Sequence, residues 1–264
     1  MASSVPVQVI GDPASPAIPA SCSSGGPPEN TVQDFGANGL LGVGVFLQDC
    51  GSACAQTAFP GGYYSCPATG CVPTKVAVAQ QLQNPVAMFS SDNNGVIIEL
   101  PAIPAAGQAT AAGTLIFGIG TQADNALGGA TVLTTDPTTG NITTLFNNQI
   151  YATSYIDAGS SLYFVGTGLY SLCGGAVAGF YCPATTQNLT ATLTGVNNVS
   201  STVSFSVANA DALNQDFYAF NDLAGTASDT VTFAWGLPFF YGRNVFVGIE
   251  SQSTPAGFGP FWAF

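Results

Sequence analysis

One segment of the chain places a carboxylate on a tight turn between two hydrophobic runs. It reads Tyr155-Ile156-Asp157-Ala158-Gly159-Ser160-Ser161-Leu162-Tyr163-Phe164. Glycine lets the backbone fold closely at such a turn, and neighbouring hydroxyl or N–H groups can hold the acid in place. A carboxylate held in this way is a candidate catalytic group, so Asp157, Gly159 and Ser160 are the candidate site residues. In the alternative interpretation, Asp157 is a turn residue capped by the hydroxyls of Ser160 and Ser161.

The seven cysteines indicate a second kind of chemistry. Three pairs lie close together in the sequence: Cys50 and Cys54, Cys66 and Cys71, Cys173 and Cys182. Short disulfide loops of this kind are typical of an oxidising compartment. A zinc site built from the first four cysteines is the alternative, although no Cys-x-x-Cys spacing occurs. Cys22 is left over, so it is free, pairs with another chain, or has its partner outside this sequence.

The charge of the chain excludes several classes of function. Only 6% of the 264 residues are charged, with Lys75 and Arg243 as the only basic side chains, no histidine and a net charge of -12. Nucleic acid is excluded as a partner because phosphate binding needs a basic surface. Without histidine, the chain has no Ser-His-Asp or Cys-His machinery and no His-bearing metal site. We expect no cofactor, and we expect the chain to stay folded in acid because it would carry few positive charges there.

Short β-prone runs alternate with turn dipeptides along most of the chain, which predicts an all-β protein with short helices. No apolar run reaches the roughly 20 residues that a membrane-spanning helix needs, so we expect no membrane insertion. A short helix is predicted over Val76–Leu82, and hairpin turns at Asn93-Asn94-Gly95 and Thr139-Gly140-Asn141. Glycosylation sequons begin at Asn141, Asn188 and Asn198. The predicted strands are Val5–Ile10, Leu40–Leu47, Gly95–Leu100, Thr114–Ile119, Ala130–Thr134, Ile142–Phe146, Thr153–Asp157, Leu162–Val165, Leu189–Thr194, Thr202–Ala208, Thr230–Ala234 and Val245–Glu250.

Four landmarks along the chain resemble pepsin-like aspartic peptidases. The Asp157 turn resembles that family's hydrophobic-Asp-(Thr/Ser)-Gly-(Ser/Thr) motif, and the residues before it, 113–128, look like the strand and loop that lead into the C-terminal lobe. The segment 235–250 resembles the family's hydrophobic pair, short Arg-bearing helix and strand ending in an acid. The segment 37–44 looks like the hydrophobic-Gly motif that supports the first active-site loop. The order also resembles a bacterial group of exported pepsin-like proteins.

The resemblance implies a catalytic pair of which the chain offers one member. In that family two aspartates share a proton and a water, because two carboxylates about 3 Å apart cannot both ionise. Asp12 and Asp34 lack the Gly-Ser/Thr context, and Ala158 replaces the usual hydroxyl residue. The expectation is an N-terminally shortened relative that is inactive in this form. Residues 1–112 would be a remnant of the N-terminal lobe with central-sheet strands, and residues 113–264 the pepsin-like C-terminal lobe.

Other functions stay open at this point. The chain could be an extracellular structural protein that reuses the fold and assembles with itself into oligomers or filaments, with residues 3–10 as a donated strand. It could bind a peptide without cleaving it, or become an active endopeptidase when completed by a missing N-terminal segment. A glycosidase with two carboxylates is the weakest alternative, because no acid pair is recognisable. All these alternatives place the protein outside the cell, at its surface or in the periplasm.

Overall fold

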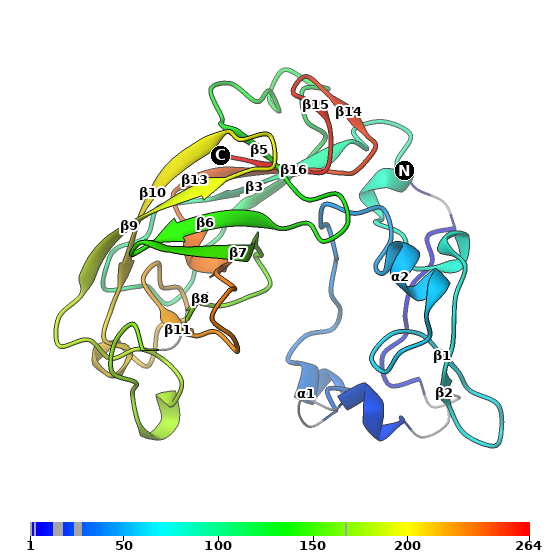
Figure 1. Cartoon of the computed structure of the whole chain (residues 1–264), viewed down its shortest axis with the longest axis horizontal. Helices are drawn as coiled ribbons and strands as arrows, with labels where there is room; N and C mark the ends of the chain where they lie inside the picture. Colours follow the sequence, from blue (N-terminus) through cyan, green and yellow to red (C-terminus); the bar gives the residue numbers. More distant parts are fainter. Residues whose placement is uncertain (1, 3, 13–17, 24–27, 167) are drawn as a thin grey trace. The chain divides into compact units, whose positions relative to one another are not determined.

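The computed structural model describes residues 2, 4–12, 18–23, 28–166 and 168–264, and it divides the chain into two compact units, Met1–Ser90 and Ser91–Phe264 (Figure 1). The sequence placed the boundary at 112/113. Strand β3 (Gly95–Leu100) instead belongs to the second unit, because it pairs along its whole length with β13 (Arg243–Gly248). Residues 95–112 therefore belong with the second unit.

The protein is mostly β-sheet with short helices, as the sequence predicts. The two α-helices are α1 (Val32–Phe35) and α2 (Gly51–Gln56), and the 3₁₀ helices are Ala20–Ser23, Val78–Gln80, Val86–Met88, Gly175–Val177, Ala210–Ala212 and Leu237–Phe239. The strands are β1 Tyr64–Ser65, β2 Val72–Pro73, β3 Gly95–Leu100, β4 Thr114–Phe117, β5 Val132–Thr134, β6 Ile142–Phe146, β7 Gln149–Ile156, β8 Tyr163–Val165, β9 Gln187–Thr194, β10 Ser200–Val207, β11 Ala224–Thr226, β12 Ala234–Trp235, β13 Arg243–Gly248, β14 Ser253–Thr254, β15 Gly257–Phe258 and β16 Phe261–Ala263. In the described part of the chain, no helix has the length and apolar character needed to cross a bilayer.

A five-stranded sheet in the second unit has the order β4-β3-β13-β16-β5. Its buried cluster consists of Ile97, Ile119, Phe246, Phe261 and Ala263. Buried Asn94 ties the edge of this sheet together, because its amide donates to the carbonyls of Ile119 and Ser253 and accepts from the Ile119 N–H. The hairpin turn expected at Asn93–Gly95 is therefore wrong: Gly95 opens β3, and Asn94 is a buried cross-link.

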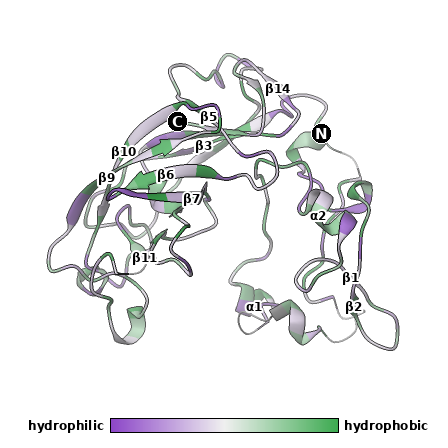
Figure 2. Cartoon of the chain, viewed as in Figure 1, coloured by the Kyte–Doolittle hydropathy of each residue, from purple (hydrophilic) through white to green (hydrophobic). Residues whose placement is uncertain are grey.

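A seven-stranded sheet forms the rest of the second unit, in the order β10-β9-β6-β7-β12-β8-β11. Its longer strands alternate buried and more exposed positions, as in β6 and β10, and Figure 2 shows the corresponding mixture of hydrophobic and hydrophilic residues. Strand β12 lies between β7 and β8, parallel to the first and antiparallel to the second. A turn does form at Thr139–Asn141, where Gly140 has a φ of 74° and its N–H donates to the Asp136 carbonyl, but the predicted hairpin is wrong, because the flanking strands β5 and β6 belong to different sheets.

Aromatic rings fill the core between these strands. The Trp235 ring stacks on Phe233 with centroids 4.3 Å apart, and it meets Tyr163, Phe205 and Phe239 edge to face. The indole N–H is buried, and it donates to the Thr144 hydroxyl at 3.0 Å. The core is therefore apolar in bulk, with its one indole donor satisfied from β6.

The first unit is held together by polar side chains and disulfides more than by an apolar core. Buried Gln81 donates to the carbonyls of Gly51 and Val76, and buried Asn84 donates to those of Gly44 and Phe46. Helix α1 is capped by Thr31 and closed by Gly36 at a φ of 72°. The buried hydrophobic residues described in this unit are only Val45, Cys54 and Val86. Amides bridging backbone groups thus replace much of the usual hydrophobic packing.

Two strands predicted in the first unit do not form. Residues 5–10 and 40–47 belong to no strand, and Ser3 of the expected donated strand lies outside the described residues. Both runs are apolar, but they lack hydrogen-bonded neighbours in a ladder; Gln48, just beyond the second run, makes an isolated bridge to Gln83. The helix expected over Val76–Leu82 is present only as the shorter 3₁₀ helix Val78–Gln80.

Candidate functional site

The Asp157 turn connects β7 to β8 and passes over the end of β12, which lies between them. The Asp157 N–H donates to the Trp235 carbonyl at 3.0 Å, and the Leu237 N–H donates to the Ser160 carbonyl at 2.6 Å. Both sides of the turn are therefore fixed to the chain that leaves β12.

Gly236 is what allows this close approach. A Cβ atom at this position would lie 2.0 Å from the Leu162 carbonyl oxygen and 2.6 Å from that of Ser160. These are backbone atoms, so they cannot move aside as a flexible side chain could. The Trp235-Gly236 pair therefore supports the Asp157 turn, with the tryptophan in the core and the glycine under the loop.

The Asp157 carboxylate is half-buried and held by its own turn. Its Oδ1 accepts from the Gly159 N–H at 2.8 Å, and its Oδ2 accepts from the Ser160 hydroxyl at 2.6 Å. The predicted site residues Asp157, Gly159 and Ser160 thus do come together. Within the second unit as described, Ser161 adds no hydrogen bond to the carboxylate.

The same hydrogen-bond pattern occurs at two other aspartates of the second unit. Asp136 accepts from the Thr138 N–H and the Thr139 hydroxyl, at 2.9 and 3.0 Å. Asp229 accepts from the N–H two residues on and the hydroxyl three residues on, at 2.8 and 2.9 Å. Backbone N–H donors, above all those of Thr139 and Val231, hold the pKa of these two carboxyls below the ordinary value. The bonds around Asp157 are therefore those of an aspartate that closes a turn.

A second acid is the missing part of a catalytic pair. In the described second unit, neither oxygen of Asp157 shares a hydrogen bond with another carboxyl group. Of the two other acids considered, Asp12 lies in no helix or strand, and Asp34 lies in α1, where it forms a local capping pair with Thr31. Ala158 carries no hydroxyl that could brace the turn.

All three predicted cysteine pairs are confirmed as disulfides: Cys50–Cys54, Cys66–Cys71 and Cys173–Cys182. The zinc alternative is therefore wrong, because its four thiols are consumed in two bonds. Asp211 lies close to the sulfurs of Cys173 and Cys182, but these are also joined to each other and leave no thiolate for a metal. Cys22 is free and exposed.

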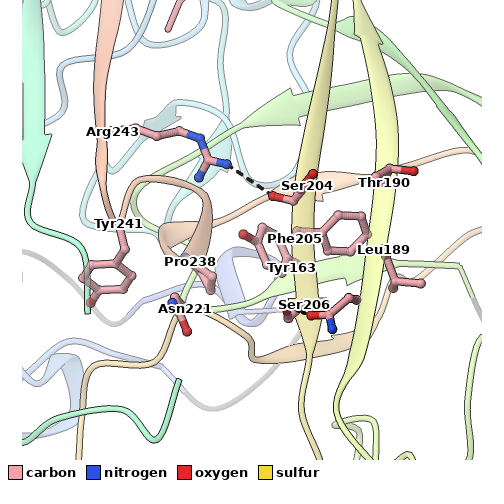
Figure 3. A pocket seen from close by; sticks show the side chains of 11 residues that line it. Tyr163, Leu189, Thr190, Ser204, Phe205, Ser206, Asn221, Pro238, Tyr241 and Arg243 are labelled. Atoms are coloured by element: carbon pink, nitrogen blue, oxygen red, sulfur yellow. Dashed lines mark hydrogen bonds between the residues drawn. The ribbon is translucent and has the colours of Figure 1, made fainter. Parts of the chain in front are cut away.

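A cavity of about 530 Å³ lies in the second unit beside the edge strand β10 (Figure 3). Arg243 borders it, and the guanidinium donates to the Phe239 carbonyl at 2.5 Å and the Ser204 carbonyl at 3.4 Å, with its carbon 4.7 Å from the Phe239 ring centroid. The lining residues are Tyr163, Asn188, Leu189, Thr190, Ser204, Phe205, Ser206, Asn221, Pro238, Tyr241 and Arg243.

The sequence interpretation of Arg243 was incorrect. The resemblance implied an Arg on a short helix, and a lone cation of this kind is expected to pair with an acid. Arg243 instead begins strand β13 and, within the described residues, no carboxylate forms an ion pair with it. The signal that could have singled it out was already available, since it is the only basic residue after Lys75. The rest of the cavity comes from segments far apart in the sequence, which no local motif connects.

Asp222 is the most unusual acid of the second unit. It is 2% exposed, and its Oδ1 is buried without a hydrogen-bond partner among the described residues. Burial raises the pKa of this carboxyl to about 6. It directly follows the lining residue Asn221 in the sequence, and its negative charge helps to raise the pKa of the Tyr163 hydroxyl.

A comparison with protein families matches one family model over residues 1–264, described as "Protein of unknown function (DUF3443)". The chain belongs to this family. The matched range includes the Asp157 turn and the Arg243 cavity alike. A comparison with curated proteins finds no match.

Proposed function

We propose that the chain is an exported protein whose second unit is pepsin-like and which does not hydrolyse peptides in this form. The proposal combines the order of the sequence landmarks with the position of Trp235-Gly236, which lies directly under the Asp157 turn as a supporting hydrophobic-Gly motif would. Three disulfides support an oxidising, extracytoplasmic location, because such bonds persist there.

The single carboxylate at the turn is the observation that carries the proposed inactivity. Peptide hydrolysis by this kind of site needs one acid to activate water and a second to protonate the substrate carbonyl. Asp157 has its two oxygens engaged by Gly159 and Ser160, and no second carboxyl group of the described second unit joins it. A lone acid of this kind can close the turn without taking part in a reaction.

The test is hydrolysis of an acid-unfolded substrate protein at about pH 3, where one carboxyl of an aspartic dyad would be protonated. Three proteins are compared: the wild-type chain, Asp157→Asn, and Asp136→Asn as a matched control at a turn of the same geometry. We expect no cleavage by any of them above a protein-free blank. Cleavage by the wild type and Asp136→Asn but not by Asp157→Asn would overturn the proposal and favour an active endopeptidase.

Self-assembly into an extracellular structure is the second candidate function, and the surface of the first unit favours it. An open groove of about 830 Å³ is lined by apolar side chains that include Val7, Val9, Leu40 and Leu41. Their exposed fractions are 75%, 65%, 76% and 58%. We propose a second copy of this chain as the occupant, because an exposed Cys22 in the same unit could link two copies covalently.

A further inference from the structure

We propose that the cavity beside β10 binds a small organic carboxylate, which the Arg243 guanidinium holds and to which the Tyr163 hydroxyl donates a hydrogen bond. Both side chains line the same cavity (Figure 3). The proposal does not depend on the peptidase question, because Asp157 is not among the lining residues.

Arg243 carries a charge that the described part of the protein leaves without an acidic partner. Its guanidinium is fixed by two backbone carbonyls and one aromatic ring, and no carboxylate of the described residues pairs with it. Partial burial removes water from the guanidinium, which disfavours its charged form and lowers its pKa. The Arg243 side chain is half-buried, and within the described chain backbone carbonyls accept from only two of its nitrogens. A guanidinium has five N–H donors, so an anion in the cavity would pair with those that remain.

Tyr163 supplies the second, independent observation. Its side chain is 1% exposed and lines the cavity, and no hydrogen bond to its hydroxyl is found among the described residues. Arg243 lines the same cavity, and its positive charge opposes the rise that burial causes in the pKa of this hydroxyl. Hydroxyl groups beside a cavity usually bond to a protein group, water or ligand, and a ligand oxygen between Tyr163 and Arg243 would provide such a partner.

The shape and charge of the surroundings narrow the ligand class. A guanidinium matches a carboxylate with two parallel hydrogen bonds, and a cavity of about 530 Å³ suits a small molecule. The net charge of -12 disfavours polyanions. Hydroxyls of Thr190 and Ser204 and the amide of Asn221 line the same space, and they suit a ligand that carries hydroxyl groups. A sugar acid has this chemistry, and the C-terminal carboxylate of a short peptide is the other source of the same group.

Binding is measured by calorimetry on the full disulfide-bonded chain in low-chloride buffer at about pH 5, where the raised pKa of nearby Asp222 keeps that acid mostly protonated. The probes are glucuronate, glucose as its uncharged counterpart, and one short neutral peptide with a free or an amidated C-terminus. We expect saturable binding of glucuronate and none of glucose. Binding of the free-acid peptide alone would support the carboxylate site and identify a peptide end as its source. If neither carboxylate binds, or if glucose binds as well as glucuronate, the proposal is overturned.

Two variants test the named groups against a matched control. Tyr163→Phe keeps the packed ring and removes only a hydroxyl that has no partner within the described protein, so it should fold normally and bind about tenfold more weakly. Arg243→Lys keeps the charge but loses the planar fork, and it should lose at least as much. Tyr218→Phe, at an 84% exposed tyrosine outside the cavity, should bind as the wild type does. Unchanged affinity in Tyr163→Phe would contradict the assigned geometry.

Discussion

At the scale of single residues, the buried carboxyl of Asp222 makes stability depend on pH. Burial raises its pKa from 3.8 to about 6, so the folded chain binds a proton more tightly than the unfolded chain. The free energy of unfolding should therefore fall as the pH rises through this window, and the loss should be complete above it.

We expect Asp222→Asn to flatten this profile. Thermal unfolding of both proteins from about pH 4 to pH 7 checks it, because only the wild type should lose several degrees in Tm over that range. If the wild-type Tm follows that of Asp222→Asn at every pH, burial does not raise the pKa of this carboxyl.

The hydrogen bond between Trp235 and Thr144 gives a second residue-scale prediction. Both side chains are fully buried, and the indole N–H donates to the hydroxyl at 3.0 Å. Thr144→Val keeps the shape but leaves the donor unsatisfied, which should cost about 1–3 kcal/mol in the free energy of unfolding. Thr144→Ser keeps the hydroxyl and is the matched control. Equal urea midpoints for the Val and Ser variants would contradict the role of the bond.

At the scale of elements, the chain leaving β12 and the Asp157 turn should behave as one packed piece. Gly236→Ala would place a methyl group 2.0 Å from a backbone oxygen, so we expect a loss of about 3 kcal/mol or more. Gly129→Ala is the control, since a Cβ there meets nothing within 4 Å. Chemical unfolding of both variants measures the difference, and similar stabilities would mean that the turn does not rest on Gly236.

The predicted strands form where a hydrophobic run has a partner strand, and they do not form where side-chain hydrogen bonds occupy the backbone groups that a strand would use. Gly95–Leu100 and Ile142–Phe146 form as predicted. The strand expected at Thr230–Ala234 is confined to Ala234–Trp235, because Asp229 takes the N–H groups of Val231 and Thr232. Residues 40–47 read as a strand but lie in a unit whose backbone is satisfied by the side chains of Gln81 and Asn84.

The two candidate sites differ in how far the sequence could reveal them. The Asp157 turn is local, so its hydrogen bonds to Gly159 and Ser160 could be anticipated from adjacent residues. The cavity is formed by long-range pairing that brings Tyr163 of β8 near Arg243 of β13. No sequence motif identifies residues that come together in this way, although the sequence does show Arg243 as one of only two basic residues.

At the scale of the whole molecule, the exposed apolar groove of the first unit predicts self-association. Without reductant, we expect part of the wild type to run as a covalent dimer through Cys22, and we expect Cys22→Ser to abolish this species. Non-covalent association should persist in Cys22→Ser, because it depends on the groove. It should weaken when Leu40 and Leu41 of the groove are both changed to Ser. Leu172→Ser, at a 52% exposed leucine of the second unit, is the control. Native mass over a wide concentration range measures this, and a strictly monomeric chain would exclude assembly.

The central claim is that Asp157 serves the fold rather than a reaction, and the free energy of unfolding of Asp157→Ala tests it most directly. An acid kept for catalysis commonly costs stability, so its removal is neutral or stabilising. An acid that closes a turn contributes through its bonds to Gly159 and Ser160, and its removal should cost about 1–3 kcal/mol at neutral pH. Asp229→Ala, at a turn of the same pattern, gives the structural reference. A loss in both variants is the predicted result, whereas a stabilised Asp157→Ala beside a destabilised Asp229→Ala would contradict the claim.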